Sequence, residues 1–280
     1  MIKIGDYNNL KVVRETDFGY FLDAETGNTS DDVLIPKKST YGVELYIDDS
    51  VEVFLYRDSK DRPVATLKKP LAKVGDLAYL KVVSNTKIGS FVDFGLERDI
   101  LVPLKEKPYG LLEGNSYLFY IYLDKTGRIA ATANIDKYLM ESSQFNVGDH
   151  VKGTVYGFQS NGSAMIAVDN RYRGVILNTE YFSKLYHGDI LDLSIIKIYE
   201  DKKLGLTPRK HAKDERTEMQ EVILNYLEAH NGFMSFNDKS NPEDIYAAFS
   251  VSKNTFKNAL GGLMKKHLIT QDENGTKLNK

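Results

Sequence analysis

Phe21 and Phe91 occupy matching positions in a repeated part of the sequence, each two residues after a glycine. An aliphatic residue, Leu22 or Val92, follows each ring, and alternation along a strand would turn that residue inward and the phenylalanine outward. An outward ring can stack on a nucleobase, which contributes about 1–3 kcal/mol per base. Phe18, close to Phe21, is a third candidate ring. The alternative for each ring is packing against a neighbouring part of the chain.

Basic residues lie near these rings in the sequence. Lys11 and Lys81 share an offset of six residues from a leading glycine, Gly5 or Gly75, and fall on the outward parity of the same expected strand. Lysines attract phosphate whatever the base sequence, and this attraction weakens as salt rises. A solvated strand face is the other interpretation of both lysines. The candidate nucleic-acid contacts of these two copies are Phe18, Phe21, Lys11, Arg14, Phe91, Lys81 and Lys87.

The rings and lysines belong to a module that occurs three times in the chain. A Gly-Asp pair opens each copy, and a second glycine follows the first by fourteen positions, as Gly19 follows Gly5. Five short apolar segments separated by polar turns fill each copy, a pattern typical of a small closed β-barrel. We predict a mainly β protein with three tandem five-stranded barrels over residues 1–70, 71–139 and 140–213.

The third copy differs from the first two because it lacks both rings. Asn161 and Ala164 stand where the phenylalanines would be. Basic residues occur in this copy, and Tyr156 falls on the outward parity of its first strand. We expect this copy to act through charge or to be a spacer, with Lys152, Tyr156, Arg171 and Arg173 as its candidate contacts.

From about residue 214 the apolar period changes from two to 3.6 residues, which indicates helices. The apolar face of the first helix consists of Met219, Val222, Ile223, Tyr226 and Leu227, and Gly232 marks its end. Asn241 before Pro242, and Ser252 before the third helix, are typical caps. A hairpin with an Asn274-Gly275 turn follows. Three helices and a hairpin predict a winged helix, an α+β domain, over residues 214–280.

The third predicted helix has two unlike faces. Its apolar face consists of Phe256, Leu260, Leu263 and Met264. In winged helices that bind DNA, the third helix enters the major groove. A solvated surface is the other explanation of its polar face. The candidate contacts on this face are Asn254, Lys257, Asn258 and Lys265.

The composition argues against several classes of site. The chain has no cysteine, which excludes disulfides and thiolate metal sites. Its histidines are scattered singly, so we expect no metal site and no cofactor; they are His150, His187, His211, His230 and His267. No apolar run approaches the roughly 18 residues of a membrane span, and the first residues lack a signal-peptide pattern. A cytoplasmic location, without a membrane or a small-molecule substrate as partner, is therefore expected.

The first copy contains Phe-Gly-Tyr-Phe-Leu at 18–22 and Val-Leu-Ile-Pro at 33–36, and this order resembles the S1 version of the oligonucleotide-binding (OB) fold. The resemblance implies that the aromatic rings around the glycine stack on bases. In the second copy, Ile88 replaces the first of the two rings. Where many S1 domains have a histidine, the three copies have Pro36, Pro103 and Leu177, which weakens the expectation of a base contact there.

The whole chain, with Asn-Pro-Glu-Asp-Ile-Tyr at 241–246 and Ser-Lys at 252–253, resembles the conserved virulence factor B family of bacterial proteins. The resemblance implies RNA binding and an influence on gene expression. The leading hypothesis is a non-catalytic regulator that binds single-stranded RNA. One alternative is a transcription regulator that reads duplex DNA through the winged helix. A ribonuclease or ribonuclease accessory factor is the other, although the acidic pairs at 31–32 and 48–49 have no histidine or phosphate loop beside them.

Overall fold

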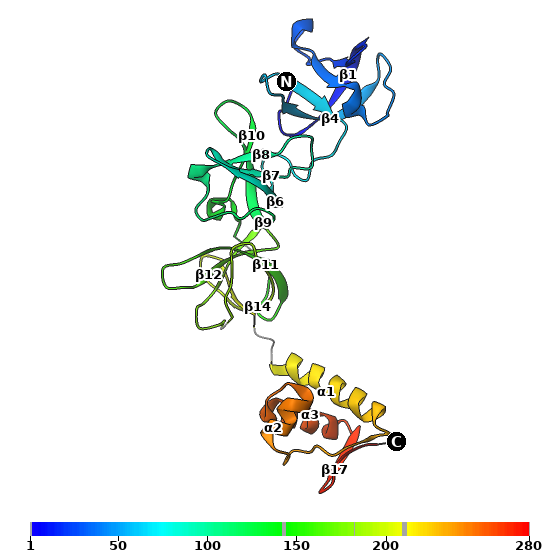
Figure 1. Cartoon of the computed structure of the whole chain (residues 1–280), viewed down its shortest axis with the longest axis vertical. Coiled ribbons are helices and arrows are strands. Elements are labelled where there is room, and N and C mark those ends of the chain that lie inside the picture. Colours follow the sequence, from blue (N-terminus) through cyan, green and yellow to red (C-terminus); the bar gives the residue numbers. More distant parts are fainter. Residues whose placement is uncertain (1, 142–143, 182, 209–211, 280) are drawn as a thin grey trace. The chain divides into compact units, whose positions relative to one another are not determined.

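The computed structural model describes residues 2–141, 144–181, 183–208 and 212–279. It contains two compact units, Met1–Pro208 and Arg209–Lys280. The first unit holds three closed five-stranded barrels, whose order along the chain can be followed by colour in Figure 1. The tandem barrels predicted from the repeats are confirmed.

The strands of the three barrels fall at corresponding places in the three repeats. Barrel 1 consists of β1 (Tyr7–Thr16), β2 (Gly19–Leu22), β3 (Val33–Pro36), β4 (Ser50–Arg57) and β5 (Pro63–Thr66). Barrel 2 consists of β6 (Leu77–Thr86), β7 (Gly89–Val92), β8 (Ile100–Pro103), β9 (Ser116–Leu123) and β10 (Ile129–Thr132). Barrel 3 consists of β11 (His150–Phe158), β12 (Ala164–Val168), β13 (Tyr172–Ile176), β14 (Ile190–Ile198) and β15 (Leu204–Thr207). Short 3-10 helices lie between strands or barrels: η1 (Thr29–Asp31), η2 (Lys37–Thr40), η3 (Leu104–Glu106) and η4 (Asp136–Tyr138).

All three barrels have the same strand order. In barrel 1 the hydrogen-bonded order is β1-β2-β3-β5-β4, and β4 pairs with β1 to close the sheet. The β3–β5 pair is parallel and the other four neighbouring pairs are antiparallel. Closure leaves no strand edge to pair with a partner. Ligand contacts must therefore come from the outer faces and the loops.

The second glycine of the repeat is required by a close approach between neighbouring strands. A Cβ atom on Gly89 would lie 2.1 Å from the carbonyl oxygen of Val102, and the φ angle of Gly89 is +153°. A Cβ atom on Gly19 would lie 2.3 Å from the carbonyl oxygen of Ile35 in barrel 1. Any side chain here would push β2 away from β3, or β7 away from β8. The second glycine of each of these two copies, fourteen positions after the first, therefore locates the strand that carries the outward phenylalanine.

Replacing Gly89 by alanine is expected to destabilise barrel 2. The added methyl group would overlap the Val102 carbonyl, and overpacking of this kind costs about 1–3 kcal/mol. Thermal unfolding followed by circular dichroism measures the loss. Gly110→Ala is the matched control, because a Cβ atom there would meet nothing within 4 Å. Equal melting temperatures for the two variants would contradict the close approach.

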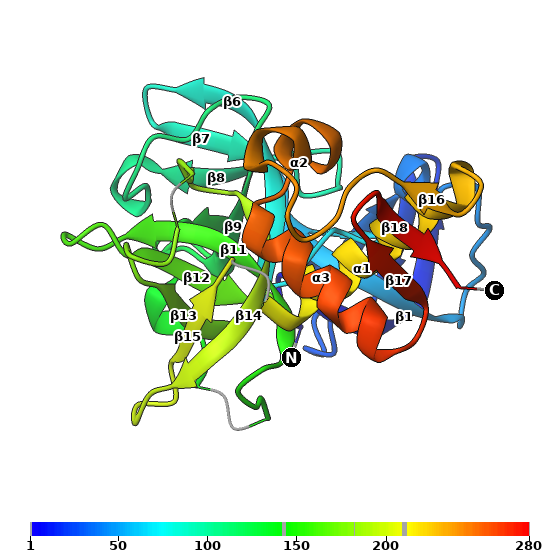
Figure 2. The same cartoon turned by 90° about the horizontal axis from the view of Figure 1, so that it is seen from below.

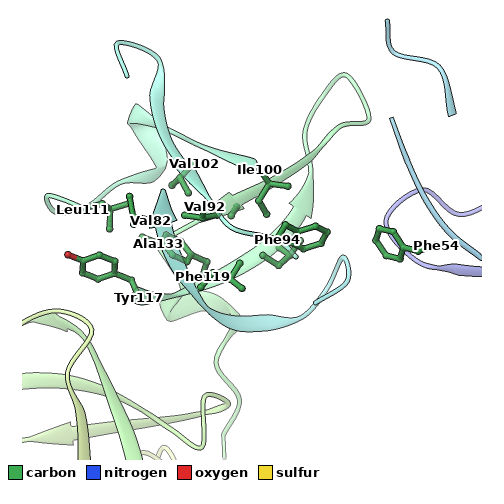
Figure 3. Packing of buried hydrophobic residues seen from close by; sticks show 13 residues of the cluster. Phe54, Val82, Val92, Phe94, Ile100, Val102, Leu111, Tyr117, Phe119 and Ala133 are labelled. Atoms are coloured by element: carbon green, nitrogen blue, oxygen red, sulfur yellow. The ribbon is translucent and has the colours of Figure 1, made fainter. Parts of the chain in front are cut away.

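Barrels 1 and 2 share an apolar junction. Val53 and Leu55 point into the core of barrel 1, while Phe54 between them points outward and joins the core cluster of barrel 2. Its ring lies 6.1 Å from the ring of Phe94, centre to centre, and Figure 3 shows the two rings as neighbours across the junction. Phe54 is fully buried. An outward residue of β4 is therefore a core residue of the two-barrel assembly.

A second apolar cluster joins barrels 2 and 3. It contains buried residues from both barrels and from the segment between them, namely Leu118, Ile135, Leu139, Tyr156 and Ala167. The rings of Tyr120 and Tyr138 stack beside it at 3.5 Å. The hydroxyl of Tyr79 in β6 donates a hydrogen bond to the carbonyl oxygen of Gly188 at 2.7 Å. These contacts cover part of the outer face of barrel 3.

The carboxyl-terminal unit contains α1 (Ala212–Ala229), β16 (Phe233–Met234), α2 (Pro242–Phe249), α3 (Lys253–Lys265), β17 (Ile269–Asp272) and β18 (Gly275–Leu278). The sheet order is β16-β18-β17, and Figure 2 shows the sheet beside α1 and α3. The winged-helix prediction is confirmed. Asn241 accepts a hydrogen bond from the amide of Glu243, and Ser252 accepts one from the amide of Thr255, as expected of caps. No helix in the described parts of the chain is long and apolar enough to span a membrane.

Three details of this unit differ from the sequence prediction. Val222 is 46% exposed and Met264 is 39% exposed, because the buried stripes of α1 and α3 are narrower than their apolar faces. The hairpin turn consists of residues 273–274. Gly275 is already part of β18, where it pairs with Asp272 of β17. The strand β16, only two residues long, was not predicted because so short a segment has no periodicity.

Candidate nucleic-acid interface

Barrel 1 presents two aromatic rings and an arginine on one outer face. Arg14 in β1 lies opposite Phe21 in β2, and its guanidinium carbon is 4.1 Å from the centre of the Phe21 ring. The ring of Phe18 meets that of Phe21 edge-on at 6.2 Å between centres. Phe18 is 60% exposed and Phe21 is half-buried, so no neighbouring barrel covers Phe18. This face can stack on bases, with a cation beside the rings to attract phosphate.

The corresponding face of barrel 2 has one phenylalanine in place of two and a serine in place of the arginine. Phe91 is half-buried in β7 and lies opposite Ser84 in β6, where barrel 1 has Arg14. Ile88, which replaces the first ring, is 61% exposed. Phe91 also lines a cleft to which barrel 1 contributes. The two phenylalanines predicted from the repeat therefore occupy equivalent outward positions.

The lysines of barrels 1 and 2 are exposed. Lys11 lies 2.7 Å from the carboxylate of Asp48, and this hydrogen-bonded contact raises the pKa of the Lys11 amine. An exposed ion pair of this kind is weak and can open to meet a phosphate. Within the described residues, Lys81 and Lys87 have no carboxylate within ion-pair distance. The structure leaves all three lysines accessible to a ligand.

Barrel 3 does not present the accessible ring that the sequence predicted. Tyr156 is only 5% exposed, and its hydroxyl donates a hydrogen bond of 2.6 Å to the carboxylate of Asp136. Burial raises the pKa of the Tyr156 phenol, and the hydrogen bond to Asp136 adds to this effect. Arg173 donates to the backbone oxygen of the same Asp136 at 2.8 Å. Tyr156 does point away from the barrel core, but the segment that follows barrel 2 covers it.

Tyr156→Phe is expected to weaken the junction and leave nucleic-acid binding unchanged. The variant removes one hydrogen bond to a charged group, worth about 1.5–3 kcal/mol. Urea unfolding measures the stability and a titration with labelled RNA measures the affinity. Tyr186→Phe is the control, since Tyr186 is 56% exposed and its hydroxyl makes no hydrogen bond within the described residues. A loss of RNA affinity in a stable Tyr156→Phe variant would show that the Tyr156 hydroxyl does contribute to RNA binding.

Other cations of barrel 3 remain accessible. Lys152 and Arg171 are exposed, and Arg171 lies over the ring of Tyr172 at 5.6 Å. The sequence interpretation missed Tyr199, whose ring has the amines of Lys197 and Lys203 within 4.7 and 5.2 Å of its centre. The signal was present as Lys197 and Tyr199 two residues apart, at the end of an expected strand.

The polar face of α3 is exposed as predicted, at Asn254, Lys257, Asn258 and Lys265. The neighbouring glycine pair has two different surroundings. A Cβ atom on Gly262 would lie 2.0 Å from the side-chain amide nitrogen, Nε2, of Gln220 in α1. A Cβ atom on Gly261 would meet nothing within 4 Å. Gly262 therefore allows α3 to pack closely against α1.

Within the described residues, no group of three or more histidine or acidic side chains is placed to hold a metal ion. His211 lies outside those residues.

Comparison with known proteins places these features in a family. A model of the S1 domain matches residues 4–68 and 74–134, and a model of the CvfB-like winged helix domain matches residues 221–278. The chain is 31% identical to the protein YitL of Bacillus subtilis strain 168 over 280 residues, which covers 97% of this chain and 92% of YitL. The chain belongs to the conserved virulence factor B family.

Two further relatives of this member of the conserved virulence factor B family are informative. Conserved virulence factor B of Staphylococcus epidermidis strain ATCC 12228 is 25% identical over 226 residues, covering 77% of this chain and 75% of that protein. A crystal structure of a multidomain protein with nucleic acid binding domains from Streptococcus pneumoniae TIGR4 is 27% identical, with a TM-score of 0.53 over 99% of this chain and 98% of that one. S1 domains and winged helices are nucleic-acid-binding modules, so this family member is built from such modules.

Proposed function

We propose that the protein is a non-catalytic RNA-binding protein of the cytoplasm that binds single-stranded RNA through barrels 1 and 2 and acts as a regulator of gene expression. The observation that carries the proposal is the repeated outward phenylalanine, Phe21 and Phe91, on equivalent strands of two barrels in one unit. Arg14, Lys11, Lys81 and Lys87 would supply the attraction to phosphate.

The aromatic face favours single strands over duplexes. A base can stack on a protein ring only when it is free of its own neighbours, as in single strands, loops and ends. Modest contacts on two barrels of one unit add to each other through effective concentration. The description of the Streptococcus pneumoniae protein as having nucleic acid binding domains supports the same proposal. Lys152 and Arg171 would extend the contact by charge alone.

A second candidate function is the reading of duplex DNA by α3. The exposed side chains Asn254, Lys257 and Asn258 favour it, because they share the face that winged helices insert into the major groove. We rank it second because few side chains on this helix could read base edges. Nuclease activity is a weaker candidate still. The S1 and winged-helix modules are typical nucleic-acid-binding modules, and the acidic pairs at 31–32 and 48–49 lie beside turns.

The deciding experiment compares three ligands at one fixed salt concentration. Labelled single-stranded RNA, single-stranded DNA of the same sequence and duplex DNA are titrated with the full chain, since affinities at different salt cannot be compared. We expect single-stranded RNA to bind most tightly. Tighter, sequence-selective binding of duplex DNA would move the function to the winged helix. Incubation with RNA and Mg²⁺ serves as a companion assay, and cleavage that persists through repurification would overturn the non-catalytic role.

A further inference from the structure

A cleft of about 370 Å³ lies where barrels 1 and 2 meet. Phe91, Ile88 and Pro103 of barrel 2 line one side of it, and Tyr56 and Arg57 of barrel 1 line another. Phe91, the proposed stacking residue of barrel 2, therefore lies at a recess with a second wall. Its volume falls at the low end of the range of about 300–1,000 Å³ that small-molecule sites occupy.

The two walls of the cleft are held together by contacts between equivalent hairpins. Arg57, at the end of β4, donates from Nε to the carbonyl oxygen of Gly127 at 3.2 Å. Arg128, from the corresponding hairpin of barrel 2, donates from Nε to the carboxylate of Asp61 at 2.5 Å. Together with the packing of Phe54 in the barrel 2 cluster, these bonds fix barrel 1 against barrel 2. Contacts within the unit therefore hold the two walls of the cleft in place.

Four polar side chains at the cleft have no partner within the described residues. They are the hydroxyls of Tyr56 and Ser59, the guanidinium of Arg98 and the carboxylate of Asp99, which form no hydrogen bond or ion pair there. The other two carboxylates of the cleft are engaged in their own turns. Asp58 accepts from the amide of Arg62, and Asp124 accepts from the amide of Arg128. The cleft thus offers one free cation, one free carboxylate and two free hydroxyls, counted over the described residues.

We propose that this cleft takes one unpaired nucleobase of the bound RNA, stacked on Phe91 and held at its edge by Tyr56, Arg98 and Asp99. The inference rests on the proposed RNA-binding function and adds to it a pocket with walls from two barrels. A base edge carries both donors and acceptors, which matches an arginine and a carboxylate that line the same cleft. The cleft is lined by three carboxylates, of Asp58, Asp99 and Asp124, and by three guanidinium groups, of Arg57, Arg98 and Arg128. It therefore has no excess positive charge to draw a phosphate in, and we expect the base to enter while the backbone stays outside. Bound RNA then contacts both barrels through one nucleotide.

The absence of tryptophan from the sequence allows a direct test. Phe91→Trp keeps a stacking ring and puts the chain's one indole in the cleft, and Phe21→Trp does the same on the open face of barrel 1. Each variant is titrated with nucleoside 5′-monophosphates and, separately, with a single-stranded RNA oligonucleotide. We expect monophosphates to quench the Phe91→Trp fluorescence saturably and to leave the Phe21→Trp fluorescence unchanged at the same concentrations.

Second substitutions test the edge contacts. In the Phe91→Trp background, Tyr56→Phe or Arg98→Ala is expected to raise the half-saturating monophosphate concentration about fivefold, the effect of one lost hydrogen bond. Lys60→Ala is the matched control, because it removes a nearby exposed cation that does not line the cleft. A shift as large in the Lys60 variant as in the Arg98 variant would overturn the edge contacts.

The oligonucleotide titration separates failure of the pocket from failure of the RNA-binding function. If the oligonucleotide quenches both indoles and monophosphates quench neither, the pocket is wrong and RNA binding by the two faces stands. If neither ligand changes either fluorescence, both proposals fall. Should Phe91→Trp melt well below the parent, photo-crosslinking of the unaltered chain to 4-thiouridine RNA replaces it. Crosslinks from a single labelled position must then reach both 56–59 and 88–103, and crosslinks to barrel 2 alone would refute the pocket.

Discussion

Replacing both Phe21 and Phe91 by alanine should weaken the binding of single-stranded RNA by tens-fold or more while the barrels stay folded. Each ring points away from the core that Leu22 or Val92 fills, so the cores remain packed. If each ring stacks on one base, the loss is about 1–3 kcal/mol per ring. The affinity is measured by fluorescence anisotropy at several salt concentrations. The dependence of affinity on salt should change little, because no phosphate contact is deleted.

Lys11→Ala with Lys81→Ala is the matched comparison for the phenylalanine pair. Both lysines are exposed, and their loss should flatten the dependence of RNA affinity on salt. Thermal unfolding of both double variants shows whether the fold is intact. Unchanged RNA affinity in a stable Phe21→Ala and Phe91→Ala variant would refute the stacking role. Marked unfolding would show that the rings are part of the packing.

The barrels could be predicted from the sequence because their pattern is local. Gly19 and Gly89 recur at a fixed distance from the start of the module, and the close approach to β3 or β8 explains why only glycine fits there. Alternation along the strand after each glycine then gave the inward and outward residues correctly. The helix caps at Asn241 and Ser252 were predictable for the same reason, since a cap is a contact between residues two or three positions apart.

The contacts between barrels could not be predicted in this way. Phe54 and Tyr156 have the same outward parity as Phe21, yet both are buried because another segment lies over them. Alternation separates the two faces of a strand, but it contains no information on what covers the outer face. Arg173 illustrates the consequence, because a basic residue expected to meet phosphate instead binds the backbone of Asp136. The candidate contact residues that stay accessible are those that no neighbouring segment buries.

The sequence also could not predict how wide the buried face of each helix is. Val222 and Met264 lie at the edge of apolar stripes that would be buried in a helix surrounded on several sides. In this unit the core consists of narrower stripes, with Met219, Ile223 and Leu227 from α1. Periodicity identified the helices correctly, whereas the number of neighbours around each helix depends on the assembled unit.

Phe54→Ala is expected to lower the stability of the two-barrel assembly by about 3–5 kcal/mol, the usual cost of removing a buried phenylalanine ring. The ring packs against Tyr7 of barrel 1 and Phe94 of barrel 2, at 5.5 and 6.1 Å between ring centres. Its loss would leave a cavity at the junction and weaken the contact on which the cleft beside Phe91 depends. Hydrogen exchange followed by mass spectrometry should show faster exchange in β4 of barrel 1 and in the 92–96 segment of barrel 2.

Leu55→Ala is the control for this prediction, because Leu55 is equally buried but lies in the core of barrel 1 alone. Its exchange should rise in barrel 1 and stay unchanged in barrel 2. The Phe54 variant should in addition lose the monophosphate response of the Phe91→Trp indole, because the wall that carries Tyr56 is no longer held in place. If exchange in the Phe54 variant rises in barrel 1 only, the ring does not couple the barrels, and the two domains bind RNA as independent modules.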